Sequence, residues 1–596
     1  MIRTPLRPLA RILDAREKGE NPDAIERENI RKRHEAQRDQ TRQRAEGRLL
    51  ILAAMFFVAF GTVGARMGLM AASQPFEPSV ASSGQTILAQ RADITDRNGR
   101  VLATNLATHA LYAHPPHMVD KARAAEELSK IFPDLNPQKL LADFTGKRKF
   151  LWIKKKLSPE QMQAVHDIGD PGLLFGPREM RLYPNGKLAA HVLGGAGFGR
   201  EGVSSAEVIG VAGVEHAFND FLRDPVNGGA PLQLSLDLTV QDAVEQVLYG
   251  GMRMMNAKGA AAVLMDAHTG ELLALASLPD FDPNDRPRPL TEGDAADSPL
   301  FNRAVQGLYE LGSTYKIFTA AQAMELGLVN AETMVDANAP MKWGKHKIKE
   351  FRNKNYGPKL SVTDVIVKSS NVGTARMALS IGANRQQDFL RELGLFSPAP
   401  VELAEAPGVQ PKYPTRWRDI HTITASYGHG VSASPLHLAA AYATVANGGW
   451  RVQPTLLAGQ GMQRDERVIS QATSEAARHM LRQVVARGTA SFGDVPGYAV
   501  GGKTGTADKP RPQGGGYYDD KVMATFASIF PAHAPKYVLI VTLDEPVETS
   551  GAQPRRTAGW TAVPVAAEII RRTAPLLGLR PEIEPASKFE VTRASN

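Results

Sequence analysis

The apolar run from Leu49 to Ala65 constrains this chain more than any other feature of its sequence. It holds 17 residues, LLILAAMFFVAFGTVGA, and after Arg66 the sequence is apolar again to Ala72. As a helix, residues 49–72 would span roughly 36 Å, enough for a bilayer core of ~30 Å. The preceding residues 31–48 include seven Lys or Arg and three acids. By the positive-inside rule we expect one membrane anchor at 49–72, with residues 1–48 as a basic cytoplasmic tail and the rest outside.

Two other interpretations of the run stay open. A buried core helix can be equally apolar, although it rarely follows so cationic a segment. A cleaved signal peptide would fit the small residues Ala71, Ala72 and Ser73, although its positively charged leader would be unusually long. The chain has no Cys, which excludes disulfides, thiolate metal sites and a cysteine nucleophile.

The part after the anchor divides into two predicted domains. Residues 73–235 form an N-terminal pedestal that begins with a Ser- and Pro-containing linker at 73–90. In the pedestal, Asn98-Gly99 between Ile94 and Val101 predicts a hairpin, residues 118–170 look mainly helical, and a helix is expected over 210–222. No residue pattern in this domain indicates catalysis.

Residues 236–580 have the pattern of a mixed α/β (α+β) domain, followed by a tail at 581–596. Helices are expected over 238–255, through much of 313–450, and over 561–577. A mostly antiparallel five-stranded sheet with helices on its faces is the economical arrangement. The five predicted strands are Ala260–Met265, Leu272–Leu278, Tyr498–Thr506, Val522–Phe530 and Tyr537–Leu543.

Ser313-Thr-Tyr-Lys316 is the first of three short motifs with chemical potential. At a helix start, positions i and i+3 share one face, so Lys316 can meet Ser313. A lysine whose pKa is lowered by burial can take the proton of a serine hydroxyl and make it a nucleophile. The alternative is an N-capping serine beside a solvated lysine.

Ser369-Ser370-Asn371 is the second motif, and it lies between two predicted helices. Ser369 could relay a proton from the nucleophile to a leaving amine, and the amide of Asn371 could both donate to and accept from a peptide group. An ordinary helix-to-helix junction is the alternative.

Lys503-Thr504-Gly505-Thr506 is the third motif, at the end of a predicted strand. Lys503 and Thr504 could hold a carboxylate, Gly505 would let a substrate backbone approach, and the amide of Thr506 could donate to an oxyanion. The alternative is a glycine-containing turn.

The order and spacing of the motifs strengthen the catalytic interpretation. The second motif follows the first by 56 residues and the third follows by a further 134, a set typical of penicillin-binding proteins and class A β-lactamases. From about residue 45 onward, the chain resembles a class B penicillin-binding protein. Ser426-Tyr-Gly-His429-Gly430 resembles a family loop that often has Gln in place of His429, for which we expect a structural role.

The resemblance implies a serine D,D-transpeptidase that needs neither metal nor organic cofactor. Ser313 would attack the D-Ala-D-Ala stem peptide of membrane-bound peptidoglycan precursors, and an amine on a neighbouring strand would resolve the acyl-enzyme and form a cross-link. Lys316, Ser369, Asn371 and Lys503 would act in catalysis, and Thr504, Gly505 and Thr506 in substrate binding. β-Lactams would trap Ser313 covalently.

Residues 507–526, after the third motif, resemble the division-type, FtsI-like enzymes. That subtype implies a place in the bacterial inner membrane at the division site, with the catalytic domain in the periplasm. It also implies an FtsW-type glycosyltransferase and other divisome membrane proteins as partners. An elongation-type transpeptidase, a membrane-tethered β-lactam sensor or β-lactamase-like protein, and a non-enzymatic scaffold remain alternatives.

Overall fold

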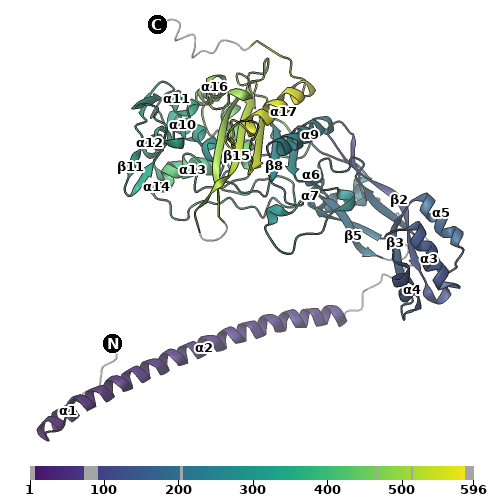
Figure 1. The fold of residues 1–596 in the computed structure, drawn as a ribbon, viewed down its shortest axis with the longest axis horizontal. Helices are drawn as coiled ribbons and strands as arrows, with labels where there is room; N and C mark the ends of the chain where they lie inside the picture. The colour runs from purple at the N-terminus through teal and green to yellow at the C-terminus, as the bar shows by residue number, and fades with distance from the viewer. Residues whose placement is uncertain (1–6, 73–90, 202–205, 465, 512–514, 584–596) are drawn as a thin grey trace. The chain divides into compact units, whose positions relative to one another are not determined.

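The structure is a computed structural model that describes residues 7–72, 91–201, 206–464, 466–511 and 515–583 (Figure 1). Contacts within the chain group it into two compact units, Met1–Ile87 and Leu88–Asn596. The linker predicted at 73–90 lies outside the described residues, as does most of the tail predicted at 581–596.

In the described residues of the first unit there are two helices, α1 (Arg7–Glu17) and α2 (Asp23–Ala72). No proline interrupts residues 23–72, and the many Ala, Glu, Arg and Leu residues favour a helix. Residues 49–72 are therefore helical, as expected. Within the described ranges, no helix meets the length and apolarity that crossing a membrane requires, so the anchor stays a prediction.

The pedestal contains a five-stranded sheet, which the sequence only partly predicted. The predicted hairpin at Asn98-Gly99 is confirmed, since β1 and β2 pair antiparallel with Ile94 opposite Ala103. The mainly helical interpretation of 118–170 missed β3, whose sequence LWIKKKL is too rich in lysine to resemble a buried strand. β3 pairs only with β2, and an edge strand tolerates such charges. The strands are β1 (Ile94–Thr95), β2 (Val101–Ala113), β3 (Leu151–Leu157), β4 (Leu173–Leu182) and β7 (Leu232–Gln233).

Helices and a second small sheet complete the pedestal. α3 (Lys121–Ile131), α4 (Pro137–Thr145) and α5 (Pro159–Ile168) bury one core with the first sheet, around Leu128 and Phe144. The helix expected over 210–222 is split at Phe218 into α7 and α8. The remaining elements are α6 (Ala190–Leu193), β5 (Gly195–Glu201), β6 (Ala206–Ala212), α7 (Gly213–Ala217) and α8 (Asn219–Arg223).

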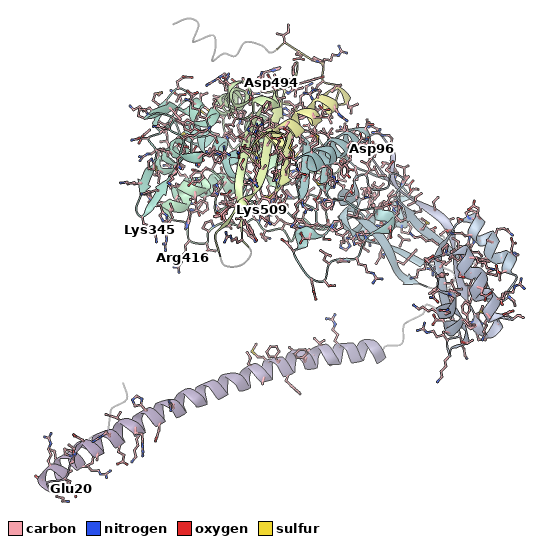
Figure 2. The ribbon with its side chains drawn as sticks, in the orientation of Figure 1. Glu20, Asp96, Lys345, Arg416, Asp494 and Lys509 are labelled. Carbon is pink, nitrogen blue, oxygen red and sulfur yellow. The ribbon has the colours of Figure 1, made fainter. Side chains whose placement is uncertain are left out.

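Asp96, labelled in Figure 2, joins the pedestal hairpin to the next domain. Its buried carboxylate accepts hydrogen bonds from the backbone N–H of Arg100 at 2.8 Å and of Leu238 at 3.1 Å. Leu238 is the first residue of α9 (Leu238–Met254), so one side chain fixes both the turn and the helix start.

The second domain has the predicted five-stranded sheet, in the order β14-β15-β16-β8-β9 with every pair antiparallel. Two strands from the start of the domain and three from its end thus meet in one sheet, as the sequence predicted. Every residue of β9 is buried, because helices cover both faces. The strands are β8 (Gly259–Asp266), β9 (Leu272–Leu278), β14 (Gly501–Pro510), β15 (Tyr517–Phe530) and β16 (Tyr537–Asp544).

α9 and α17 (Ala562–Leu576) pack together on one face of the sheet (Figure 1). α15 (Pro435–Ala446) and α16 (Gln471–Arg487) pack on the sheet as well and cover its other face. The helical middle of the domain also holds two short antiparallel strand pairs that the sequence did not predict: β10 (Met334–Asp336) with β13 (Lys359–Ser361), and β11 (Met341–Trp343) with β12 (His346–Ile348). Its helices are α10 (Lys316–Glu325), α11 (Val362–Val367), α12 (Asn371–Ile381), α13 (Ala383–Glu392), α14 (Asp419–Ala425), α15 (Pro435–Ala446) and α16 (Gln471–Arg487).

The boundaries of β14 differ from the prediction. The strand begins at Gly501 rather than Tyr498, and it continues past Thr506 to Pro510. Ala499 has a φ of 42°, which interrupts the extended backbone just before the strand. Lys503 therefore lies near the start of the strand and not at its end.

Glu215 provides a test of what holds the pedestal together. Its fully buried carboxylate accepts hydrogen bonds from Arg91 Nε at 2.7 Å, Arg181 Nε at 2.6 Å and Tyr183 Oη at 3.2 Å. Glu215→Ala would leave two buried guanidinium groups without their anion, so we expect a loss of ~3–5 kcal/mol in the free energy of unfolding. Denaturant unfolding measures this loss. Glu127→Gln, which removes an exposed ion pair with Lys130, is the control and should not move the midpoint. A Glu215→Ala chain as stable as the parent would contradict the prediction.

Candidate active site

Ser313 lies in a single 3₁₀ turn, Gly312–Tyr315, that leads directly into α10. Gly312 has a φ of 56°, a conformation that favours glycine. The turn is tightly held, because a Cβ at Gly505 would lie 2.2 Å from the carbonyl oxygen of Leu311, and one at Gly428 would lie 2.1 Å from that of Gly312. The turn that holds Ser313 therefore lies in close contact with β14 on one side and with the loop at 427–430 on the other.

Gly505 consequently has a packing role that the sequence did not reveal. The space left by its missing side chain is occupied by Leu311 and Thr314, and Gly505 does not line the cleft. Its predicted part in admitting a substrate backbone stays a prediction.

Lys316 is completely buried, and its Nζ is directed at the second motif. It lies 2.6 Å from the carbonyl oxygen of Ser369, 2.7 Å from Asn371 Oδ1 and 3.2 Å from Ser369 Oγ. Burial lowers the pKa of Lys316 to about 7, while the negative charge of Glu350 acts in the opposite direction.

The neutral form of Lys316 has a defined orientation in this setting. An uncharged amine has two N–H donors and one lone pair. The Ser369 carbonyl and Asn371 Oδ1 can only accept, so they take both donors and leave the lone pair for a hydroxyl. Ser313 Oγ has no hydrogen-bond partner among the described residues and lies three positions before Lys316, on the adjoining turn. The hydrogen bond between a nucleophile and its general base often forms only when substrate binds.

The second motif forms the turn between α11 and α12, as predicted. Ser370 caps α12 by accepting from the backbone N–H of Gly373 at 3.0 Å. Ser369 has a φ of 60°, which is unusual for a residue other than glycine and carries strain that the surrounding contacts must offset. This conformation turns the Ser369 hydroxyl toward both lysines.

Lys503 is the second buried lysine, and its Nζ lies 2.9 Å from Ser369 Oγ and 3.0 Å from the carbonyl oxygen of Thr504. Burial lowers the pKa of Lys503 well below its ordinary value, and the neighbouring charge of Lys316 lowers it further. One hydroxyl, Ser369 Oγ, is therefore shared between two amines, each of which loses its proton readily.

A cleft of about 610 Å³ lies beside these groups and is lined by Ser313 and Ser369. Thr504 and Thr506 of β14 line it; Thr504 Oγ1 lies 2.7 Å from Thr489 Oγ1, and Thr506 Oγ1 accepts from the backbone N–H of Ala558. Five of the eight predicted site residues therefore line the cleft, while Lys316, Lys503 and Gly505 lie buried beside it. Its lining includes Ser313, Ser369, Asn371, Thr504, Thr506, the cations Arg352, Lys354, Lys368 and Arg556, and the acids Asp508 and Asp519.

His429, for which a structural role was expected, also lines this cleft. Its Nδ1 lies 3.1 Å from Glu310 Oε2, and Glu310 accepts as well from the backbone N–H of Gly430 at 3.0 Å and from Tyr517 Oη at 3.0 Å. These contacts join the loop at 427–430 to the start of β15. Lys509, labelled in Figure 2, lies farther along β14. It donates to Asp544 at 2.6 Å and to Glu545 at 2.8 Å.

Glu350 is a buried residue of the site that the motifs did not reveal. Its carboxylate contacts the second motif and lies near Lys316. It follows the short strand β12 without any spacing typical of a catalytic group, so only its position in space identifies it.

In the described ranges, no group of three or more His, Cys, Asp or Glu side chains could hold a metal ion.

Comparison with known proteins agrees with this arrangement. Residues 260–571 match the family model of the penicillin binding protein transpeptidase domain, and residues 86–228 match that of the penicillin-binding protein dimerisation domain. The chain is 35% identical over 563 residues to the probable peptidoglycan D,D-transpeptidase FtsI of Caulobacter vibrioides, with 92% of each chain covered. It is 27% identical to the peptidoglycan D,D-transpeptidase FtsI of Escherichia coli K12, over 78% of this chain and 80% of that one.

Solved structures show the same fold. The crystal structure of penicillin-binding protein 3 from Mycobacterium tuberculosis complexed with aztreonam has a TM-score of 0.62 and 26% identity, and covers 84% of this chain and 99% of that one. The ampicillin complex has a TM-score of 0.63, with 84% and 98% covered. The transpeptidase match spans more than half of the sequence, and the fold and the relatives agree with it. The chain therefore belongs to the class B penicillin-binding proteins, a family of serine acyl-transferases.

Proposed function

We propose that this protein is a D,D-transpeptidase that cross-links the stem peptides of septal peptidoglycan through an acyl-enzyme on Ser313. One observation carries the proposal: two buried lysines, Lys316 and Lys503, converge on Ser369 Oγ at the edge of the cleft that contains Ser313. Acyl transfer by a serine needs a base that is neutral near physiological pH, and burial provides one here. The relatives named as peptidoglycan D,D-transpeptidases support the substrate class.

In the acylation step, Lys316 takes the proton of Ser313 while Ser313 Oγ bonds to the carbonyl carbon of the penultimate D-Ala. The bond to the terminal D-Ala then breaks, and the proton passes through Ser369 to the leaving amine. Asn371 orients Lys316 and faces the peptide backbone of the donor. The amide of Thr506, on the strand against the nucleophile turn, donates to the oxyanion.

Lys503, Thr504 and Thr506 bind the terminal carboxylate of the donor. A carboxylate beside Lys503 would offset the burial that now disfavours its charge, so binding and protonation of this lysine reinforce one another. In the second half-reaction an acceptor amine attacks the ester, its proton returns through the same groups, and Ser313 is released.

The placement in the cell forms part of the proposal and rests on the sequence. Residues 1–48 form a cytoplasmic tail, 49–72 an inner-membrane anchor, 73–235 the pedestal, 236–580 the periplasmic transpeptidase domain and 581–596 a tail. An FtsW-type glycosyltransferase and other divisome membrane proteins are the proposed partners, since a single-span protein needs a membrane complex to bring it to nascent glycan.

Labelling of membranes with a fluorescent penicillin tests the catalytic assignment. Ser313→Ala should abolish covalent labelling while the chain stays folded, because the acylated oxygen is gone. Lys316→Ala should slow acylation by roughly 10²-fold or more, the scale expected for a lost general base. Full labelling of a folded Ser313→Ala chain would refute the assignment. Rapid hydrolysis of the adduct in the parent chain would favour a β-lactamase-like protein.

Protease treatment of intact spheroplasts tests the topology. Residues beyond ~73 should be digested and an N-terminal tag protected, because seven Lys or Arg in residues 31–48 retain that side in the cytoplasm. Digestion of the tag, or a mature chain that begins near Ser73, would contradict the single anchor.

Depletion in growing cells tests the division subtype. Loss of a septal transpeptidase should block constriction while the side wall continues to grow, so we expect long filaments with segregated chromosomes. A fluorescent fusion should gather at midcell. Round or wide cells and a fusion along the side wall would indicate an elongation enzyme and leave the chemistry intact.

A further inference from the structure

Glu350 binds the turn that contains the second motif through both of its carboxylate oxygens. Oε1 accepts from Ser370 Oγ at 2.6 Å and from the backbone N–H of Val372 at 3.2 Å, and Oε2 accepts from the backbone N–H of Asn371 at 2.7 Å. The side chain is almost fully buried, with 3% of its surface exposed. A carboxylate at this depth must be neutralised by its surroundings.

The N-terminus of α12 supplies part of that neutralisation. α12 has 11 residues and begins at Asn371, so two of the three donors to Glu350 are free backbone N–H groups of its first turn. The helix dipole also favours a negative charge at this end. These contacts hold the carboxylate in place, and it in turn holds the start of α12 against the segment after β12.

The same segment fixes which side of the Asn371 amide faces the lysine. Asn371 Nδ2 donates to the carbonyl oxygen of Lys349 at 2.9 Å, while Asn371 Oδ1 lies 2.7 Å from Lys316 Nζ. With the amide reversed, its NH₂ group would point at Lys316 and compete for the lone pair of the neutral amine. Lys349 and Glu350 together hold Asn371 by its side chain and its backbone.

Glu350 also contributes the negative charge that acts on Lys316. The ionisable groups that face Lys316 are Glu350 from the segment after β12 and Lys503 from β14; Ser369 and Asn371, from the turn before α12, are neutral. Tyr356, whose hydroxyl pKa is raised by burial and by Glu350, is neutral as well. Glu350 is thus the negative charge that opposes the effect of burial on Lys316.

We propose that Glu350 is a positioning residue for acylation, which holds the Ser369–Asn371 turn and sets through its charge the pH range in which Lys316 accepts the proton of Ser313. The inference rests on the function proposed above, and it concerns the control of that chemistry. The length and the charge of the Glu350 side chain act separately, so substitutions can distinguish their effects.

The sign of the effect follows from the charge. A nearby anion stabilises the protonated form of Lys316, and burial opposes it and brings the pKa to about 7. Acylation by the neutral amine should therefore rise as the pH passes through about 7. Removal of the Glu350 charge lowers the pKa of Lys316, so the increase in acylation rate should occur at lower pH. Because Lys316 is then a weaker base, the maximum rate at high pH should also be lower.

The experiment is the acylation rate constant of the full-length chain with a fluorescent penicillin between pH 5 and 9. Glu350→Gln should move the rise in rate down by roughly 0.5–1 pH unit, and it should lower the plateau because its NH₂ group opposes the N–H of Asn371. Glu350→Asp keeps the charge but is one methylene shorter, so the rise should stay at the parent pH while the plateau falls.

Glu402→Gln is the matched control. Glu402 is a partly buried carboxylate that accepts from Thr455 Oγ1 at 2.8 Å and from the backbone N–H of Leu456 at 2.8 Å, and it does not line the cleft. Its substitution should leave the pH profile unchanged. A thermal unfolding scan of each variant establishes that it is folded.

Several outcomes would overturn the proposal. One is a folded Glu350→Gln chain whose rise in rate stays at the parent pH. Another is an equal displacement in Glu350→Asp, which would mean that charge is not the determinant. If Glu350→Gln does not fold, Glu350→Asp alone decides, because a displaced rise contradicts the proposal and an unmoved one supports it. Ser313→Ala tests the function separately: if that chain is not labelled but Glu350→Gln has the parent profile, only the role of Glu350 falls.

Discussion

The burial of two lysine side chains around one serine hydroxyl is the constraint on which the rest of this structure depends. An ammonium group in a low-dielectric interior is costly, so Lys316 and Lys503 are held where the neutral form competes with the charged one. Burial of two amines requires a large and rigid set of surrounding residues. The five-stranded sheet supplies Lys503 from β14, and the helices on that side supply Lys316 from α10 and Ser369 from the turn before α12. Along the chain, Ser369 is 53 residues from Lys316 and 134 residues from Lys503, so the three groups meet only in the complete domain.

Close backbone contacts make this arrangement precise enough for chemistry. The nucleophile turn fits between β14 and the loop at 427–430 because Gly428 and Gly505 have no side chains, and a Cβ at either would overlap the backbone of the turn. Gly312 is needed for a different reason, since its φ of 56° favours glycine. A side chain at Gly428 or Gly505 would therefore displace the turn that holds Ser313. The glycine of the third motif is thus explained by the packing of the protein against itself, whereas the threonines on either side of it face the cleft.

Much of the site, and the main sheet, could be predicted from the sequence because their signals are local. Ser313 and Lys316 are separated by one helical turn, and the strands around Val263 and Leu539 are short apolar runs with clear ends. Other features depend on contacts between distant segments. The lysine-rich β3 is a strand only because it occupies a sheet edge, and the φ of Ser369 is set by neighbours on both sides. Glu350 has no recognisable spacing to any motif, and only its contacts with the second motif place it in the site.

The two lysines titrate as a pair, and this explains why a single buried carboxylate has so much influence. Each amine lies beside Ser369 Oγ, so a proton on one lowers the affinity of the other for a second proton. The charge of Glu350 acts against the effect of burial on Lys316. In the role proposed for it, this carboxylate favours a state in which one proton is available to the two amines and the hydroxyl between them. A serine acyl-transferase needs that state twice in each cycle, because it must remove a proton from its nucleophile and then return one to the departing amine.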